Sequence, residues 1–210
     1  EAPEHYRTIL DQTRREAEQA ERLLAMRDAS FREEQARSQI GFVEVASSLP
    51  PDTALISYLR YDDYPTGAGS PPVPSYVAFI LRSGDGTAVL VPLGRATDID
   101  SSIERWKQEV SVKSTNPAGA ATPADTTYQQ TSTELRRRIW DPVAARLKGI
   151  RRVFIVPDGP LNLVNLAALP AGSSGYLIEK GPTLHYLSSE RDLVSARDEP
   201  ARAEGLLVMG

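Results

Sequence analysis

The feature that most constrains the fold is a short apolar run, Val153–Val156, which follows two arginines and stops abruptly at a Pro-Asp-Gly turn. Four consecutive large apolar residues bounded by turn-forming residues are typical of a strand buried on both faces, because a half-exposed strand would alternate with polar residues. Such a strand lies in the middle of a parallel or mixed sheet with helices on both sides. The sequence therefore predicts an α/β sandwich organised around this strand.

Composition restricts the classes of function that remain. The chain has 210 residues, 24 basic and 28 acidic, and a net charge of −4, which is not the basic excess of a nucleic-acid-binding surface. The absence of cysteine excludes disulfides, thiolate metal sites and a cysteine nucleophile supplied by this chain. No apolar run approaches the ~20 residues of a membrane helix. We therefore expect a cytoplasmic chain with no cofactor, no membrane partner and no nucleic-acid partner.

The first 48 residues differ in pattern from the rest. From residue 3 to about 40, apolar and small residues recur every three or four positions, which predicts one long amphipathic helix. Its stripe consists of Tyr6, Leu10, Thr13, Ala17, Ala20, Leu24 and Phe31, with Arg27 interrupting it. Two interpretations stay open for residues 1–48. They are an amphipathic helix docked on its own domain, or a helical connector from an upstream region such as a repeat array.

Residues 49–210 are predicted to form the α/β domain, which starts at the hard stop Pro50-Pro51. From Thr53 the period becomes two, which predicts a strand over 55–61. Strands over 76–81 and 87–91 are predicted to follow, joined by a hairpin turn at 84–86, and the three form an antiparallel meander. A helix follows, for which Thr97 and Asp98 are the capping candidates. Its buried face is predicted to carry Ile99, Ile103, Trp106 and Val110.

The next stretch, 113–127, is polar and predicts a connector without regular structure. A second helical pattern then places Leu135, Ile139, Val143 and Leu147 on one face. Pro142 interrupts this pattern, so we expect a break near Trp140. Asp141 would cap the new helix, with proline at its first position.

After the organising strand, a leucine-rich stretch precedes two short extended pieces, 176–179 and 183–187. Ser189 and Asp192 have capping-box spacing and predict a short helix that ends near Arg197. Residues 205–210 have the pattern of a second buried strand. Because domains seldom end on such a strand, we expect the chain to be part of a longer one.

This order of elements resembles the CHAT domain, a caspase-like family often found behind tetratricopeptide repeats. The resemblance rests on the strand with its Pro157-Asp158-Gly159 end, the segment Leu161–Leu169, Tyr176–Glu179, Leu184–Ser189 and Leu206–Gly210. Two local departures occur. Val164-Asn165 stands where the family usually has Leu-Pro, and Leu187-Ser188-Ser189 stands where Pro-Ser is usual.

The resemblance implies a clan of cysteine peptidases, in which a His/Cys dyad forms the thiolate that attacks the peptide carbonyl. It places both dyad residues after the strand predicted at 205–210, so this chain corresponds to the N-terminal, pseudo-caspase part. No catalytic residue and no metal ligand carries over. The structural motif that does carry over consists of Pro157, Asp158, Gly159 and Leu161. The implied partners are the protease half of the domain, on the same or a separate chain, the upstream helical or repeat region, and a protein substrate or activator.

Two histidines and one aspartate are the candidates for other chemistry. His185 has Ser188 and Asp192 near it in sequence, but neighbours along an extended piece do not make a triad, so we interpret it as a structural or surface residue. His5 lies among charged residues of the first helix and is expected to be solvated. Asp158 could serve a site at the end of a sheet strand, but we favour turn chemistry, since Asp bonds nearby backbone N–H groups and Gly159 permits positive φ.

Two further patterns are weak. Arg136–Arg138, with Arg151 and Arg152, could contact phosphate, but three consecutive arginines on a helix point in different directions and fit a solvated face. Gly67-Ala68-Gly69 lacks the strand–loop–helix setting of a nucleotide fingerprint.

Three hypotheses of function follow. The first is the N-terminal, non-catalytic portion of a CHAT-family caspase-like cysteine endopeptidase, which scaffolds and regulates the half that carries the dyad. The second is a non-catalytic protein-interaction module, either a degenerate or a processed relative. The third is a stand-alone hydrolase that uses His185.

Overall fold

The computed structural model describes residues 2–25, 35, 38–64, 71–115, 123–172 and 175–194. The chain divides into two compact units, Glu1–Phe42 and Val43–Gly210. The first unit contains α1 (Ala2–Ala25), which confirms the predicted helix as far as residue 25. Ile9, Leu10 and Leu23 are exposed on it. Arg27 and Phe31 of the predicted stripe lie outside the described residues.

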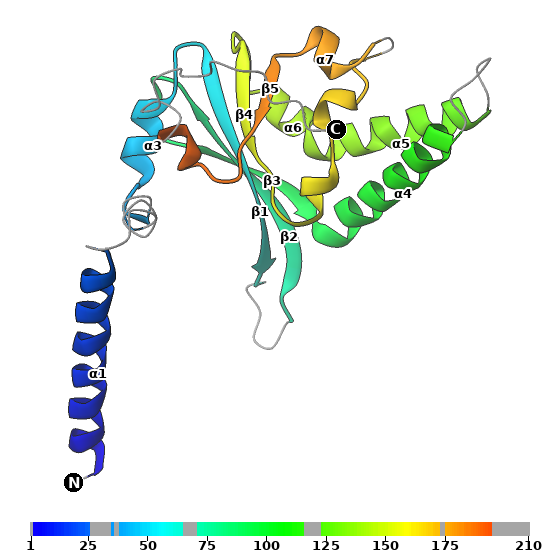
Figure 1. The fold of residues 1–210 in the computed structure, drawn as a ribbon. Helices are drawn as coiled ribbons and strands as arrows, with labels where there is room; N and C mark the ends of the chain where they lie inside the picture. Colours follow the sequence, from blue (N-terminus) through cyan, green and yellow to red (C-terminus); the bar gives the residue numbers. More distant parts are fainter. Residues whose placement is uncertain are drawn as a thin grey trace. The chain divides into compact units, whose positions relative to one another are not determined.

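The second unit is built on a five-stranded mixed sheet in the order β3-β2-β1-β4-β5 (Figure 1). The strands are β1 (Thr53–Asp63), β2 (Val73–Arg82), β3 (Val89–Arg95), β4 (Arg152–Val156) and β5 (Thr183–Tyr186). The first three form an antiparallel meander, and β4 pairs in parallel with β1 and with β5. The α/β class, the meander and the interior position of β4 are confirmed. The middle strand is β1, because the connection after β3 returns β4 to the open edge of β1.

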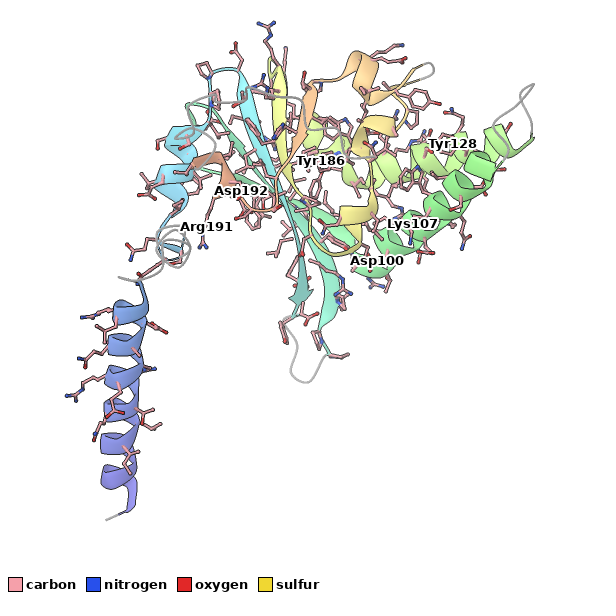
Figure 2. The ribbon with its side chains drawn as sticks, viewed as in Figure 1. Asp100, Lys107, Tyr128, Tyr186, Arg191 and Asp192 are labelled. Carbon is pink, nitrogen blue, oxygen red and sulfur yellow. The ribbon has the colours of Figure 1, made fainter. Side chains whose placement is uncertain are left out.

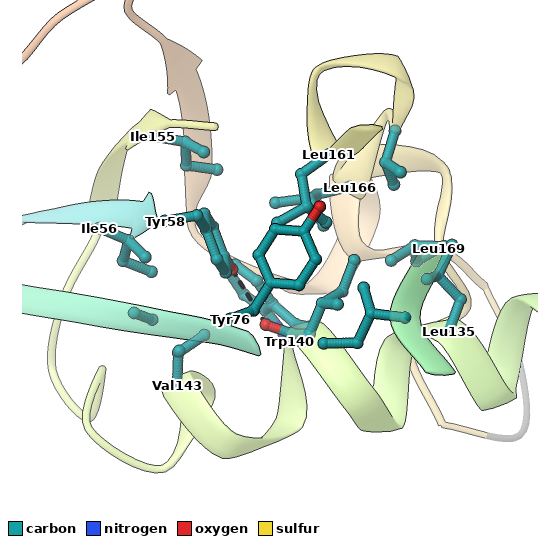
Figure 3. Close-up of a cluster of buried hydrophobic side chains, with 14 of the residues drawn as sticks. Ile56, Tyr58, Tyr76, Leu135, Trp140, Val143, Ile155, Leu161, Leu166 and Leu169 are labelled. Atoms are coloured by element: carbon teal, nitrogen blue, oxygen red, sulfur yellow. Dashed lines mark hydrogen bonds between the residues drawn. The ribbon is translucent and has the colours of Figure 1, made fainter. Parts of the chain in front are cut away.

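One face of the sheet forms the main core. Register sets Ile56 of β1 level with Ile80 of β2 and Ile155 of β4, and these side chains are at most 1% exposed. Figure 3 shows Ile56 and Ile155 among the buried side chains of this cluster. The covering helices are α4 (Ala96–Thr115), α5 (Pro123–Ile139) and α6 (Asp141–Ala144), with the 3₁₀ turns η1 (Gly159–Leu163) and η2 (Leu166–Ala168). Burying apolar side chains from both layers is what holds sheet and helices together.

The opposite face carries the alternate residues of the same strands. Leu55 lies level with Phe154 of β4, and both are buried. On this side α3 (Phe42–Ser48) buries Val45, and Leu193 is buried from the segment after β5. The sheet is therefore flanked by helices on both faces, as its uniformly apolar strand predicted.

The helices that cover the main core differ from the sequence prediction in their ends. Ile99, Ile103 and Trp106 are buried on α4 as predicted. However, α4 begins at Ala96, so Thr97 and Asp98 lie in its first turn rather than before it. The predicted connector 113–127 is wrong at both ends, since α4 reaches Thr115 and α5 starts at Pro123. Residues 116–122 lie outside the described residues.

The predicted break between the next two helices is confirmed. Helix α5 ends at Ile139, Trp140 turns, and α6 starts with proline in its first turn. The expected cap is wrong, because Trp140 holds the N-cap position without a side-chain bond. Asp141 instead pairs with Arg136, with 3.1 Å between Oδ1 and Nε.

The segments after β4 give one correction and one confirmation. Residues 176–179, predicted as extended, belong to the one-turn helix α7 (Leu177–Lys180). The Glu179 carboxylate accepts a bond of 2.9 Å from the Tyr176 amide and so closes the first turn. The extended piece at 183–187 is confirmed as β5. The strand predicted at 205–210 lies outside the described residues.

Candidate functional site

The corner after β4 is held by the carboxylate of Asp158. Its Oδ1 accepts a bond of 2.8 Å from the Gly159 amide, at the start of η1. Its Oδ2 accepts a bond of 2.8 Å from the Arg60 amide of β1. The parallel pairing of β1 with β4 ends at Ser57 and Val156. The carboxylate of Asp158 therefore accepts a hydrogen bond from a β1 amide beyond the last residue pair of β1 and β4. One side chain thus joins β1, the end of β4 and η1.

Backbone geometry and space explain the glycine of the corner. Gly159 has φ +55°, in the left-handed region that favours glycine. A Cβ there would lie 3.3 Å from the Tyr76 hydroxyl and 3.5 Å from Cδ of Arg60. Pro157 leads into the turn, and Leu161 is 3% exposed and fixes η1 in the core. These four predicted residues therefore occupy one closely packed corner.

Beside the corner lies a polar cluster that the sequence did not reveal. The Tyr76 hydroxyl donates to Oδ1 of Asp100 at 2.9 Å, and Arg60 Nε lies 3.8 Å from Oδ2 of the same carboxylate. Burial, with the hydrogen bond to Asp100, raises the pKa of Tyr76, so Tyr76 stays a protonated donor. The three residues come from β2, α4 and β1, and no sequence spacing links them. Figure 2 labels Asp100 at the start of α4. The cluster ties β1 and β2 to α4 at the corner.

We predict that Asp158→Ala lowers the free energy of unfolding by about 2 kcal/mol, because two backbone amides lose a charged acceptor. Asp158→Asn should lose about half as much, because the amide oxygen can still accept one of the two bonds. Urea unfolding of both variants measures the difference. An alanine variant as stable as the parent would contradict the role given to Asp158.

His185 lies on β5, on the face of the sheet opposite the main core, level with Phe154. Its ring meets the Phe154 ring edge to face, with centroids 5.6 Å apart and an angle of 71° between planes. The Asp192 carboxylate, labelled in Figure 2, accepts bonds from the Ser188 and Ser189 amides at 3.1 and 2.9 Å. These hydrogen bonds confirm the predicted capping role of Asp192. Its carboxylate is therefore bound to backbone amides. The side chain of His5 is outside the described part of the chain.

Arginines of α5 are engaged within the protein. Arg136 donates to the Pro170 carbonyl at 2.9 Å, in addition to its pair with Asp141. Glu134 forms two ion pairs through its Oε1 atom. Nη2 of Arg138 lies 3.2 Å from this oxygen, and Nη2 of Arg105 of α4 lies 2.9 Å from it. Burial works to raise the pKa of Glu134, but the two arginines outweigh it and lower that pKa. Arg136 therefore fastens α5 to α6 and to the loop before α7, whereas Glu134, which Arg138 holds within α5, fastens α5 to Arg105 of α4.

Within the described ranges, no group of three or more metal-ligating side chains is present. No described helix is long and apolar enough to cross a membrane. Gly67–Gly69 lie outside the described residues.

Comparison with known proteins bears on the C-terminal part of the chain. Residues 129–210, which include the Asp158 corner, match the family model described as CHAT domain. Neither the curated proteins nor the solved structures give a match. This match confirms the resemblance found from the order of the sequence elements: residues 129–210 are similar to the CHAT domain, which belongs to a family of caspase-like peptidases.

Proposed function

We propose that this chain is the N-terminal, non-catalytic portion of a CHAT-type cysteine endopeptidase in the cytoplasm. Its role is to scaffold and regulate the half that carries the His/Cys dyad. One observation carries the proposal: residues 129–210 match the CHAT family, while the 210 residues contain no cysteine. A thiolate nucleophile must therefore come from outside this sequence.

The edge of the sheet supports a scaffolding role. Among the described residues β5 pairs only with β4, so its other edge offers backbone donors and acceptors to a further strand. The strand is only four residues long, Thr183–Tyr186, but it is firmly attached. The hydroxyl of Tyr186 accepts a bond of 2.8 Å from the Leu166 amide and donates to the Val164 carbonyl at 3.3 Å. A protease half that extends the sheet would find a fixed template here.

The Asp158 corner lies at the carboxyl end of β4, where chains of α/β proteins form their sites. Its hydrogen bonds set the direction in which the chain leaves the sheet. In this proposal the corner positions η1, η2 and α7 against the protease half. The first unit, with α1, connects to an upstream helical or repeat region, and activation is relayed from there.

A protease assay tests the non-catalytic part of this proposal. The chain alone should release no fluorescence from labelled casein above the buffer rate, and His185→Ala should behave identically. Hydrolysis by the parent chain that disappears in His185→Ala would establish a stand-alone hydrolase instead. Hydrolysis that survives in the variant would also contradict the proposal, since another residue of this chain would then be catalytic.

A further inference from the structure

A cavity of about 440 Å³ opens on the second face of the sheet, between the end of α3 and strands β4 and β5. This volume is within the range of protein sites that bind small ligands or side chains. The side chains used in the following argument are Leu49, Phe154, Leu187 and Leu193 on the apolar wall, with Arg152 and His185 as the polar members. Phe154 and Leu193 are buried, whereas Arg152 and His185 are exposed. The cavity thus has an apolar floor and a polar rim.

The rim carries one sign of charge. No carboxylate occurs among the described residues that line the cavity. Within the described part of the chain, no acidic side chain lies within ion-pair distance of the Arg152 guanidinium. Two carboxylates of the segment after β5 are engaged elsewhere, Glu190 by the Ser57 hydroxyl and Asp192 by backbone amides. An arginine that has no acidic partner among the described residues, next to a histidine, is well suited to bind a carboxylate.

We propose that this cavity is a docking site for an acidic peptide segment of a partner protein. One large apolar side chain of the segment enters against Phe154 and Leu193. A carboxylate next to it pairs with Arg152, and His185 donates a second hydrogen bond. Charge complementarity selects this occupant, because a basic segment would be repelled by Arg152 and would find no carboxylate among the described lining residues. The proposal depends on this cavity alone, and it holds whether or not the chain supports a peptidase.

The test uses the full chain and two acetylated, amidated hexapeptides, EDLFED and its basic analogue KKLFKK. In methyl NMR spectra, EDLFED should shift the signals of Leu187 and Leu193 saturably, and KKLFKK should not. Arg152→Glu should weaken binding of EDLFED at least tenfold. Arg146→Glu makes the same charge change at an exposed arginine that does not line the cavity, and it should weaken binding less than twofold.

Three results would overturn the proposal. The first is that the methyl signals do not shift, as when the cavity is filled by another segment of this chain. The second is equal binding of both peptides. The third is an equal loss of affinity for EDLFED in the two glutamate variants. The last would mean that the peptide responds to overall charge. Amide spectra verify that each variant is folded. If Arg152→Glu is not, Arg152→Gln replaces it with the same tenfold criterion, and Arg146→Gln becomes its control.

Discussion

Replacing Ile155 by alanine is expected to lower the free energy of unfolding of the Val43–Gly210 unit by about 4 kcal/mol. Ile155 has no exposed surface, and its strand is paired on both sides. Truncation removes buried methyl groups and leaves a cavity in a layer that cannot collapse, because β1 and β5 hold the backbone of β4. Urea unfolding followed by tryptophan fluorescence measures the loss, since Trp106 and Trp140 are both buried in this unit.

The matched control is Leu163→Ala on η1. This leucine is 57% exposed, so its truncation should change stability by no more than about 0.5 kcal/mol. Similar losses at the two positions would mean that β4 is not the buried strand on which the fold depends.

Replacing Gly159 by valine is expected to lower the free energy of unfolding by about 3 kcal/mol. Part of this is strain, because a β-branched residue is a rare outlier at φ +55°. The rest arises from crowding, because the new Cβ approaches the Tyr76 hydroxyl and Arg60. The Tyr76–Asp100 bond must then shift or break. Thermal and urea unfolding give the total effect.

Gly149→Val separates strain from crowding. Gly149 also has positive φ, +83°, but a Cβ there would meet nothing within 4 Å. The free energy of unfolding of Gly149→Val should therefore fall by only about 2 kcal/mol, through strain alone. Equal losses at Gly149 and Gly159 would show that the packing around the Asp158 corner contributes nothing.

The parts of the fold that the sequence predicted are those in which local pattern and burial agree. β4 was recognisable because its apolar run had no polar alternation, and Ile155 is buried as that pattern requires. The break at Trp140 was predictable because Pro142 has no backbone N–H group and therefore cannot donate the hydrogen bond that would continue the helix. The capping role of Asp192 follows from a three-residue spacing that acts locally.

The predictions that were wrong concern segments whose structure depends on contacts between distant residues or on competing local hydrogen bonds. Residues 176–179 were predicted to be extended, but the hydrogen bond from the Tyr176 amide to the Glu179 carboxylate favours a helical turn. Residues near Tyr128 looked like a polar connector, yet Tyr128 is buried and its hydroxyl bonds the Ala168 carbonyl at 3.3 Å. Such tertiary contacts outweigh weak propensity.

The candidate site shows the same division. Asp158 and Gly159 are adjacent and form a recognisable turn, so sequence alone identified the corner. Arg60, Tyr76 and Asp100 meet only after two strands and a helix have packed. The cavity beside His185 likewise joins residues from α3 to Leu193. Neither arrangement has a signal in a single sequence.

The central proposal is that this chain scaffolds a thiol peptidase whose nucleophile is supplied from outside these 210 residues. The direct measurement is titration of the product of the complete gene with a thiol-directed electrophile, followed by both intact mass and peptidase activity. The account predicts that activity falls in proportion to alkylation of one cysteine. It also predicts that Asp158→Ala lowers the rate of that alkylation. A complete gene product without a reactive cysteine, or one whose peptidase activity survives full alkylation, would contradict the claim.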